Sequence, residues 1–228
     1  MSKATVKFSE LVNEFRAVSS GRNNLLDAIL PPLGFVALNG LWGLRAALVG
    51  SLALGLGLAG LRLVKRQSLG YVAGGLAVTG ISLLTALLSG RAEDYFLAQI
   101  ASTALTIVGC FGSVLVGRPL VAFTSHLARG WPLRWYWQAR VRPAYSEVTL
   151  AWGALFALKM LSQFLIYRQG RTAALGLFNI LTGWPATVLV LAGSYLYGLW
   201  RLKRLRGPSV AEFAREAPPP WEGQQRGF

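Results

Sequence analysis

One lysine lies in the middle of an otherwise apolar stretch, AWGALFALKMLSQFLIYRQG (residues 151–170), and its ammonium group is the side chain there best suited to chemistry. An ammonium group held against lipid costs about 2.5–3.5 kcal/mol on insertion scales, so Lys159 should face other helices instead. Gln163 lies one helical turn further along the same face. The other polar side chains that the apolar segments offer to an intramembrane site around this lysine are Asn39, Asn179 and Thr182.

Three roles for Lys159 stay open. It can donate to backbone carbonyls that Pro31, Pro32 or Pro185 leave without a partner. It can sit in a solvated cavity and bind an anionic solute or a lipid headgroup. It can serve a proton or ion relay, but a relay needs an acidic partner at the same depth. None of the nine acidic residues lies in the middle of an apolar segment, so the relay is the least favoured role.

The sequence contains few other side chains that could take part in catalysis. The chain has one histidine, His126, and one cysteine, Cys110, so it can form neither an intramolecular disulfide nor a cysteine-based metal cluster. Acidic residues such as Asp94 are expected at helix ends, where water reaches them. No HExxH, Gly-x-Ser-x-Gly or phosphate-binding glycine motif occurs. The sequence therefore predicts that the protein is not an enzyme and uses no cofactor and no metal.

The composition places these residues in a membrane protein. Hydrophobic residues make up 54% of the 228 residues and charged residues only 14%, whereas about a quarter of a soluble domain is charged. About 20 apolar residues cross a ~30 Å hydrocarbon core. The predicted spans are residues 25–42, 46–64, 69–88, 97–116, 149–167 and 172–200. The first contains Pro31 and Pro32, so a re-entrant or interfacial segment is its alternative, and the last must tilt, kink at Pro185 or protrude.

The distribution of Lys and Arg favours six spans over five. Of the 23 Lys and Arg residues, 18 lie before the first span, between the end of span two (Arg62 included) and span three, between spans four and five, or after the last. The other three connections carry four. Such a bias puts the basic connections in the cytoplasm. The expected fold is an all-α, polytopic membrane protein, a six-transmembrane-helix bundle with both termini cytoplasmic.

The longest connection, residues 117–148, interleaves arginines with tryptophans. In a soluble protein this pattern suggests single-stranded nucleic acid binding, but between two membrane spans an interfacial belt that contacts lipid phosphates accounts for it better. Specific lipid or protein docking is the alternative, and no nucleic acid partner is expected. The residues predicted at the headgroup interface are Arg118, Arg129, Trp131, Arg134, Trp135, Trp137, Arg140 and Arg142.

The sequence divides into three parts. Residues 1–24 are expected to form an amphipathic segment on the cytoplasmic surface. Residues 25–205 make up the six-span membrane domain. Residues 206–228 are basic and then Pro-rich, which predicts a disordered tail. Small residues four apart, such as Gly70 and Gly74, favour close helix packing within the bundle over a homo-oligomer face.

Three stretches carry a resemblance to a known family: LPPLGFVALNGLWGLRAALV (30–49), GRAEDYF followed by an apolar segment and GRPL (90–120), and LAWGALFALKMLSQFLIY (150–167). They resemble an uncharacterised family of six-span bacterial membrane proteins, a domain of unknown function (three-one-five-nine) common in actinobacteria. More distantly, the layout is similar to the intracellular septation protein A family of inner-membrane envelope proteins. The resemblance implies six membrane helices, an inner-membrane location and no enzymatic activity, and it brings no substrate or catalytic residue.

Two functions remain in view. The first is a non-enzymatic structural or scaffolding protein of the bacterial envelope, in the cytoplasmic (inner) membrane. It would act through anionic lipid headgroups and a membrane-protein partner or a second copy of itself. The alternative is a small transporter or channel for an ion or small anionic solute, with a polar path around Lys159.

Overall fold

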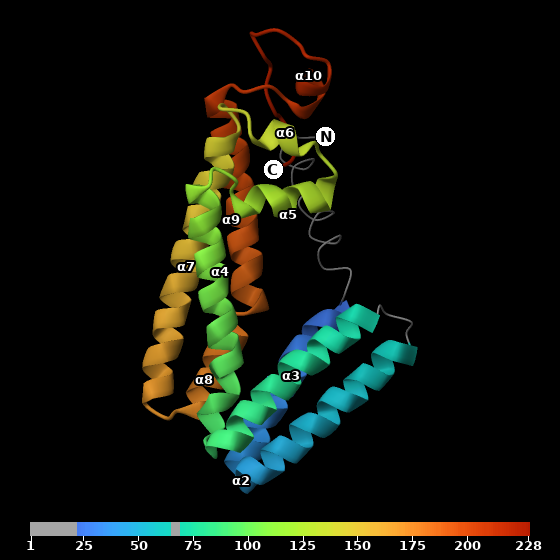
Figure 1. Cartoon of the computed structure of the whole chain (residues 1–228), viewed down its shortest axis with the longest axis vertical. Helices are drawn as coiled ribbons and strands as arrows, with labels where there is room; N and C mark the ends of the chain where they lie inside the picture. The colour runs from blue at the N-terminus through green and yellow to red at the C-terminus, as the bar shows by residue number, and fades with distance from the viewer. Residues whose placement is uncertain (1–21, 65–68) are drawn as a thin grey trace, which may run out of the picture. The chain divides into compact units, whose positions relative to one another are not determined.

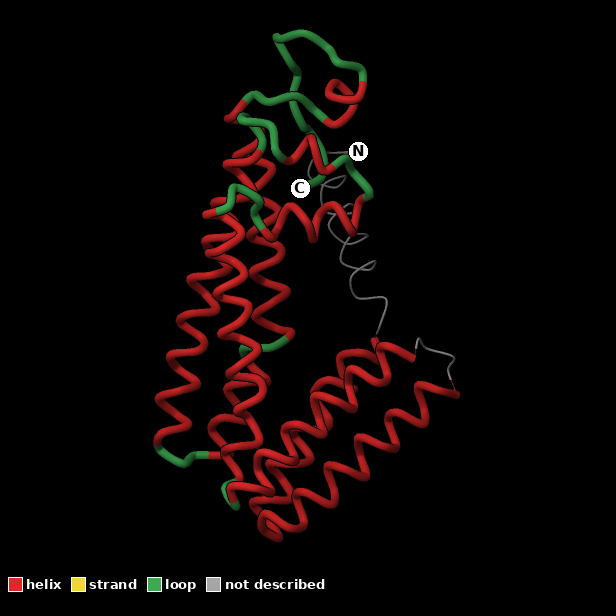
Figure 2. The backbone as a smooth tube through the Cα atoms, in the orientation of Figure 1, coloured by secondary structure: helices red, strands yellow, loops and turns green. Residues whose placement is uncertain are grey.

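The computed structural model describes residues 22–64 and 69–228, in which helices are the only regular secondary structure (Figure 2). The amphipathic segment predicted over residues 1–24 lies outside the described residues except for its last three. The helices are α2 (Arg22–Val64), α3 (Leu69–Ser89), the short 3-10 helix η1 (Ala92–Phe96), α4 (Leu97–Leu115), α5 (Leu120–Arg129), α6 (Leu133–Tyr136), α7 (Arg142–Arg168), α8 (Thr172–Leu181), α9 (Trp184–Leu205) and α10 (Val210–Ala214).

Four helical segments among the described residues are long and apolar enough to cross a membrane. They are Leu30–Leu61, Ala92–Leu115, Arg142–Arg168 and Thr172–Leu205, with mean hydropathies between 1.5 and 1.7. Leu76–Ser89 is a further, shorter apolar helix. The chain is therefore an all-helical membrane protein.

The chain divides into two compact units, which are described separately. The first unit comprises the described residues up to Ile100 together with Gln163–Pro185. The second unit comprises Ala101–Ser162 and Ala186–Phe228.

In the first unit, α2 is two helical arms joined at a sharp bend, and the arms run back along each other beside α3 (Figure 1). The bend is at Gly43, whose φ of 80° and ψ of 179° are not helical and favour glycine. Gly34 packs on the Leu54 side chain and Gly50 on that of Leu38. Because each pair is symmetric about the bend, α2 is an antiparallel hairpin with glycine at the closest contacts.

The core of the first unit joins this hairpin to η1 and α8. The Phe35 ring stacks on the Tyr95 ring at 4.0 Å between centroids, and the buried Leu83 and Leu175 belong to the same cluster. The turn that separates α8 from α9 comes at Thr182–Gly183. Pro185 explains it, because a proline cannot donate to the carbonyl four residues earlier and its ring clashes there.

In the second unit, α4, α7 and α9 lie side by side, and α5, α6 and α10 gather at one end of them (Figure 1). A Cβ atom at Gly153 of α7 would lie 3.2 Å from Cβ of Cys110 in α4, so glycine allows these helices to approach closely. The Trp152 indole donates to the Ser194 hydroxyl across 2.9 Å and connects α7 to α9.

Residues 206–228 differ from the sequence expectation of disorder. They contain α10, whose first turn is closed by a capping box between Ser209 and Glu212. The Glu212 carboxylate also accepts the backbone N–H groups of Glu222 at 2.7 Å and Gly223 at 3.3 Å. The composition of a Pro-rich segment indicates that it cannot build a core of its own. Composition does not reveal whether the segment packs into a core that other residues supply. Here Phe228 is buried against the second unit.

Candidate functional site

The connection between α4 and α7 folds into a layer at one end of the second unit, and we call residues 118–145 the platform. Its core is aromatic: Trp135, Tyr136 and Tyr145 are fully buried. Their rings meet edge to face, with centroids 5.0 Å apart for Trp135 and Tyr136 and 4.9 Å apart for Tyr136 and Tyr145. Burial raises the pKa of the Tyr136 phenol, which donates to Ser125 across 3.1 Å. The platform is therefore a packed structure, and its core is completed by Leu202 of α9 and by Phe228.

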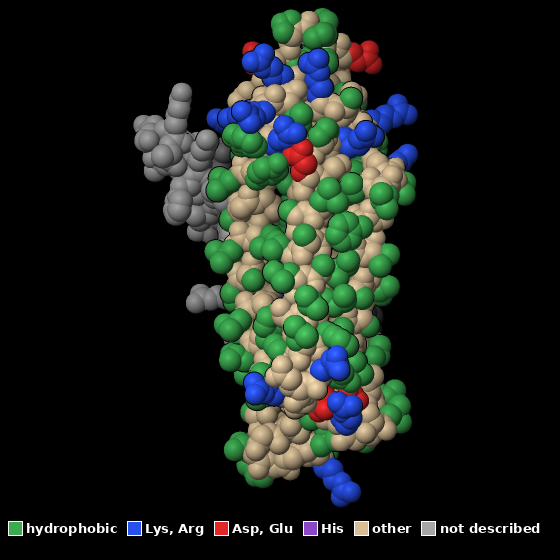
Figure 3. Space-filling model, turned by 90° about the vertical axis from the view of Figure 1, so that its left-hand side faces the viewer, with side chains coloured by type: hydrophobic (Ala, Val, Ile, Leu, Met, Phe, Trp, Pro, Cys, Tyr) green, Lys and Arg blue, Asp and Glu red, His purple; other side chains and the backbone are tan. Residues whose placement is uncertain are grey.

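Arginines surround this core on the outside. Arg118, Arg134, Arg140 and Arg142 are exposed. The Arg118 guanidinium lies 5.5 Å from the centroid of the Trp137 ring, and that of Arg129 lies 5.0 Å from the Trp131 ring. A guanidinium over an indole ring can still direct N–H groups at an acceptor or an anion. On the face of the molecule shown in Figure 3, Lys and Arg side chains gather at the platform end and again near the other end of the view, and hydrophobic side chains cover the helices next to the platform.

Trp135 is the one residue of the predicted headgroup set that lies wholly inside the platform. Its indole N–H donates to the carbonyl of Pro208 across 2.8 Å. The basic and aromatic pattern of the sequence does not separate tryptophans of the platform core from those that are partly exposed, such as Trp131 and Trp137.

The single histidine closes a turn of the platform. Nδ1 of His126 lies 2.5 Å from the carbonyl oxygen of Trp131, which can only accept, so this nitrogen carries the proton. α5 ends at Gly130, whose φ of 69° is left-handed. His126 thus positions the chain between α5 and α6.

The predicted intramembrane set is only partly brought together. The Gln163 amide donates to Oδ1 of Asn179 across 2.5 Å, and both side chains are buried. Oε1 of Gln163 and Nδ2 of Asn179 have no hydrogen-bond partner among the described residues. Thr182 instead donates to the carbonyl of Phe178 in its own helix, at 2.7 Å. The pair is therefore a buried polar spot with one acceptor and one donor to spare.

Lys159 and Asn39 lie outside that pair. Lys159 belongs to the second unit, whereas Gln163 and Asn179 belong to the first. The lysine side chain is partly exposed. Asn39 is also partly exposed, near the end of the first arm of α2.

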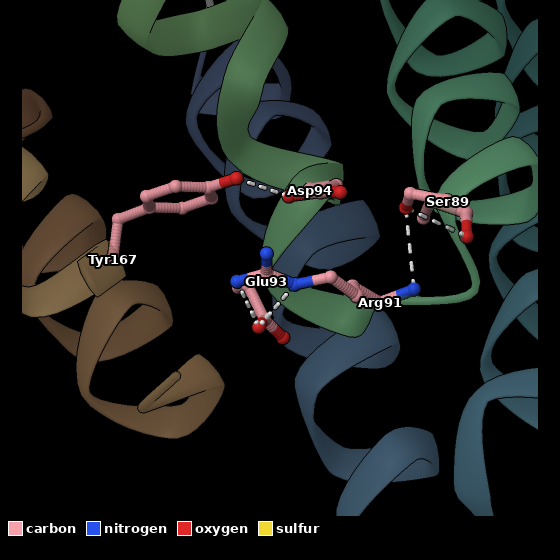
Figure 4. Close-up of polar contacts among 6 residues, drawn as sticks. Ser89, Arg91, Glu93, Asp94 and Tyr167 are labelled. Atoms are coloured by element: carbon pink, nitrogen blue, oxygen red, sulfur yellow. Dashed lines mark hydrogen bonds and ion pairs between the residues drawn. The ribbon is translucent and has the colours of Figure 1, made fainter. Parts of the chain in front are cut away.

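A polar cluster around η1 is absent from the sequence predictions (Figure 4). The Tyr167 hydroxyl donates to the buried Asp94 carboxylate at 2.5 Å, and the Thr85 hydroxyl donates to the Asp94 carbonyl at 2.8 Å. Arg91 pairs with Glu93 at 2.7 Å and lies over the Tyr167 ring. Asp94 is only 5% exposed, so the expectation that water reaches it is wrong. Tyr167 lies one helical turn beyond Gln163 on the same face of α7. This spacing could have predicted that the Tyr167 side chain points toward other helices.

A second unpredicted polar contact connects α7 to α9. Arg201 holds both oxygens of Glu147, with N–O distances of 2.7 and 2.6 Å. Tyr197 donates to the same carboxylate at 2.7 Å. Among the described residues, no group of three or more His, Cys, Asp or Glu side chains is placed to hold a metal ion.

Comparison with known proteins identifies the family. A family model described as "Protein of unknown function (DUF3159)" matches residues 20–203, which include the platform and end before the tail. No curated protein and no solved structure matches the chain. The likeness to the septation protein A family stays a prediction. Because this family model matches most of the chain, the protein belongs to this family of unknown function.

Proposed function

We propose that the protein is a non-enzymatic, six-span protein of the bacterial inner membrane whose platform binds anionic lipid headgroups and so supports the cell envelope as a scaffold. The observation that carries the proposal is the platform itself, a folded aromatic layer with four exposed arginines, two of which, Arg118 and Arg140, lie over tryptophan rings. Lipid phosphates are the anions that such a layer meets at a membrane surface.

The helix lengths support six crossings. The bend at Gly43 divides α2 into arms of 21 residues each, Arg22–Trp42 and Leu44–Val64. The helix α3 has 21 residues, α4 has 19 and α7 has 27. The interrupted pair α8 and α9 supplies the sixth segment. Each is close to or beyond the roughly 20 residues that a crossing needs.

The charges favour a cytoplasmic platform. An even number of crossings puts both termini on one side, and the 18 Lys and Arg residues of the termini and even-numbered connections then lie on that side together. The helix α5 fits an interfacial position, because Leu120 and Leu127 are exposed on it next to the arginines. Apolar side chains beside basic ones are what a helix in the headgroup layer requires.

The test compares two variants that each lose three exposed arginines. The variant Arg118→Gln/Arg134→Gln/Arg140→Gln loses three positive charges of the platform. The control variant Arg45→Gln/Arg168→Gln/Arg171→Gln loses three positive charges near the connections on the opposite side of the membrane. Phospholipids that copurify with each protein in mild detergent are quantified by mass spectrometry. We expect the platform variant to lose most of its phosphatidylglycerol and cardiolipin and the control to retain them, and equal retention in the two would contradict the proposal.

A second function, passage of a small polar solute, is supported by the spare acceptor and donor of the Gln163–Asn179 pair. It requires water to reach the middle of α7. A Lys159→Cys variant in a Cys110→Ala background tests this with a membrane-impermeant thiol reagent. Labelling from either side would support transport, and inertness from both sides would favour the scaffold alone.

A further inference from the structure

The end of the tail inserts an aromatic ring into the platform end of the second unit. The Phe228 ring stacks on the Tyr145 ring, with centroids 4.4 Å apart and planes 8° from parallel. Phe228 is only 9% exposed. Because Tyr145 belongs to the buried aromatic core, Phe228 extends that core from 83 residues away.

The walls around this ring fit a planar side chain closely. Gly198 of α9 contacts the face of the Phe228 ring so closely that a Cβ atom at that position would clash with it. Gly227 has a φ of +80°, which favours glycine, and a Cβ atom there would lie 2.7 Å from the Trp131 indole. The pocket therefore takes an aromatic side chain that follows a glycine.

A charged donor fixes the main chain at the same place. Nε of Arg129 donates to the carbonyl oxygen of Phe228 across 3.0 Å, while the guanidinium stacks on Trp131. Further back, Gln224 accepts the N–H of Val210 at 3.1 Å and Glu212 accepts those of Glu222 and Gly223. The path of the tail is thus fixed up to the point where the ring enters.

The pocket and its occupant come from different parts of the chain. Arg129, Trp131, Tyr145 and Gly198 lie within the residues that match the family, and Phe228 lies outside them. Peptide-binding sites commonly combine an aromatic-lined pocket for one side chain with a polar group for the main chain. A buried aromatic anchor of this kind also supplies most of the energy in many interfaces.

We propose that this pocket is a peptide-recognition site for a glycine followed by an aromatic residue, and that residues 226–228 fill it in cis. The site would accept the same segment from another chain when its own tail is displaced. This inference is independent of lipid binding by the platform arginines, and its test uses no lipid readout.

Two glycines of α9 give a matched pair of variants. Alanine has a higher helix propensity than glycine at either position. At Gly198 the new Cβ atom would occupy the place of the Phe228 ring, whereas at Gly193 nothing lies within 4 Å. Gly198→Ala should therefore block the pocket without weakening α9, and Gly193→Ala should leave it open.

The experiment uses the full chain with Phe228→Ala, which leaves the pocket open, and a fluorescent peptide of residues 219–228. We expect saturable binding in the micromolar range by anisotropy, weakened at least tenfold when the peptide carries the Phe228→Ala or Gly227→Ala change. Adding Gly198→Ala to the protein should abolish binding, and adding Gly193→Ala should not.

Hydrogen exchange on the intact tail provides a second readout in the otherwise unchanged protein. Gly198→Ala should speed exchange across residues 222–228, and Gly193→Ala should leave it as in the parent. The proposal is overturned if the wild-type and Phe228→Ala peptides bind alike, if neither binds, or if the two glycine variants exchange alike.

Discussion

At the scale of single residues, the most consequential feature inside the helices is the amide pair of Gln163 and Asn179. One hydrogen bond joins the two side chains, and a spare acceptor and donor remain. Exchanging the oxygen and nitrogen of both amides leaves the same balance, because each amide carries one acceptor and one donor group. The pair therefore costs free energy to bury, and it costs more when only one partner is present.

We predict that the two single substitutions of this pair together cost more stability than the double substitution does. Gln163→Leu or Asn179→Leu alone leaves a buried amide without its partner, a loss of about 1–3 kcal/mol. The double variant buries only apolar groups, so its loss should be smaller than the sum of the two. Unfolding temperatures in detergent measure this, with the partly exposed Asn39→Leu as control, and additive losses would contradict the coupling.

Two tyrosine–carboxylate contacts of equal chemistry but unequal burial provide a second test. Asp94, the acceptor of Tyr167, is 5% exposed, whereas Glu147, the acceptor of Tyr197, also holds Arg201. Tyr167→Phe should lower stability by about 1.5–3 kcal/mol, the usual value of a hydrogen bond to a charged group. Tyr197→Phe should cost clearly less, because Glu147 keeps its arginine. Equal losses on thermal unfolding would show that the η1 cluster is not structural.

At the scale of elements, α10 and the residues after it are held by one carboxylate. Glu212 accepts four hydrogen bonds: the N–H and hydroxyl of Ser209, and the N–H groups of Glu222 and Gly223. Hydrogen bonds to the charged form lower the pKa of Glu212 from the ordinary 4.5 to about 2. This side chain ties α10 to the residues that follow it, in addition to the packing of Phe228 in the core of the second unit.

We predict a matching pH dependence for the tail. Because the pKa of Glu212 is lower in the folded tail than in an unfolded one, its contribution is fully present above pH 4.5. It should decrease as the pH falls below that value and be lost below about pH 2. The carbon-13 shift of the Glu212 carboxyl reports its midpoint directly. A midpoint near 4.5 would mean that the hydrogen bonds to Glu212 do not form in solution.

The long apolar helices were predictable from the sequence, and the features that were not predictable have physical causes. Runs of about 20 apolar residues between basic connections are a local signal, so α3 and α4 begin and end within two residues of their predicted limits. The order of the tail and the burial of Trp135 and Asp94 depend on partners far away in the chain, namely Tyr145, Pro208 and Tyr167. A pattern read along one segment contains no information on such partners.

At the scale of the whole molecule, the proposed function depends on which side of the membrane each connection occupies. Within the second unit, the end of α4, the start of α7 and the end of α9 all meet the platform (Figure 1). These three ends must therefore share one face of the membrane. The basic residues of the platform and of the tail favour the cytoplasmic face under the positive-inside rule, as the proposed function requires.

We predict opposite labelling of two exposed positions in a Cys110→Ala background. Ala139→Cys in the platform should react with an impermeant maleimide only in inside-out membrane vesicles. Gln169→Cys, between α7 and α8, should react only in right-side-out vesicles. Labelling of both positions from the same side would contradict an odd number of crossings between them and with it the six-span arrangement.

The most direct measurement of the central claim is the unfolding temperature in nanodiscs of zwitterionic or anionic lipid. A ligand that binds only the folded protein raises that temperature. The wild-type protein and the Arg45→Gln/Arg168→Gln/Arg171→Gln control should both unfold several degrees higher in phosphatidylglycerol than in phosphatidylcholine, and the Arg118→Gln/Arg134→Gln/Arg140→Gln variant should not. An equal rise in all three proteins would contradict lipid binding by the platform.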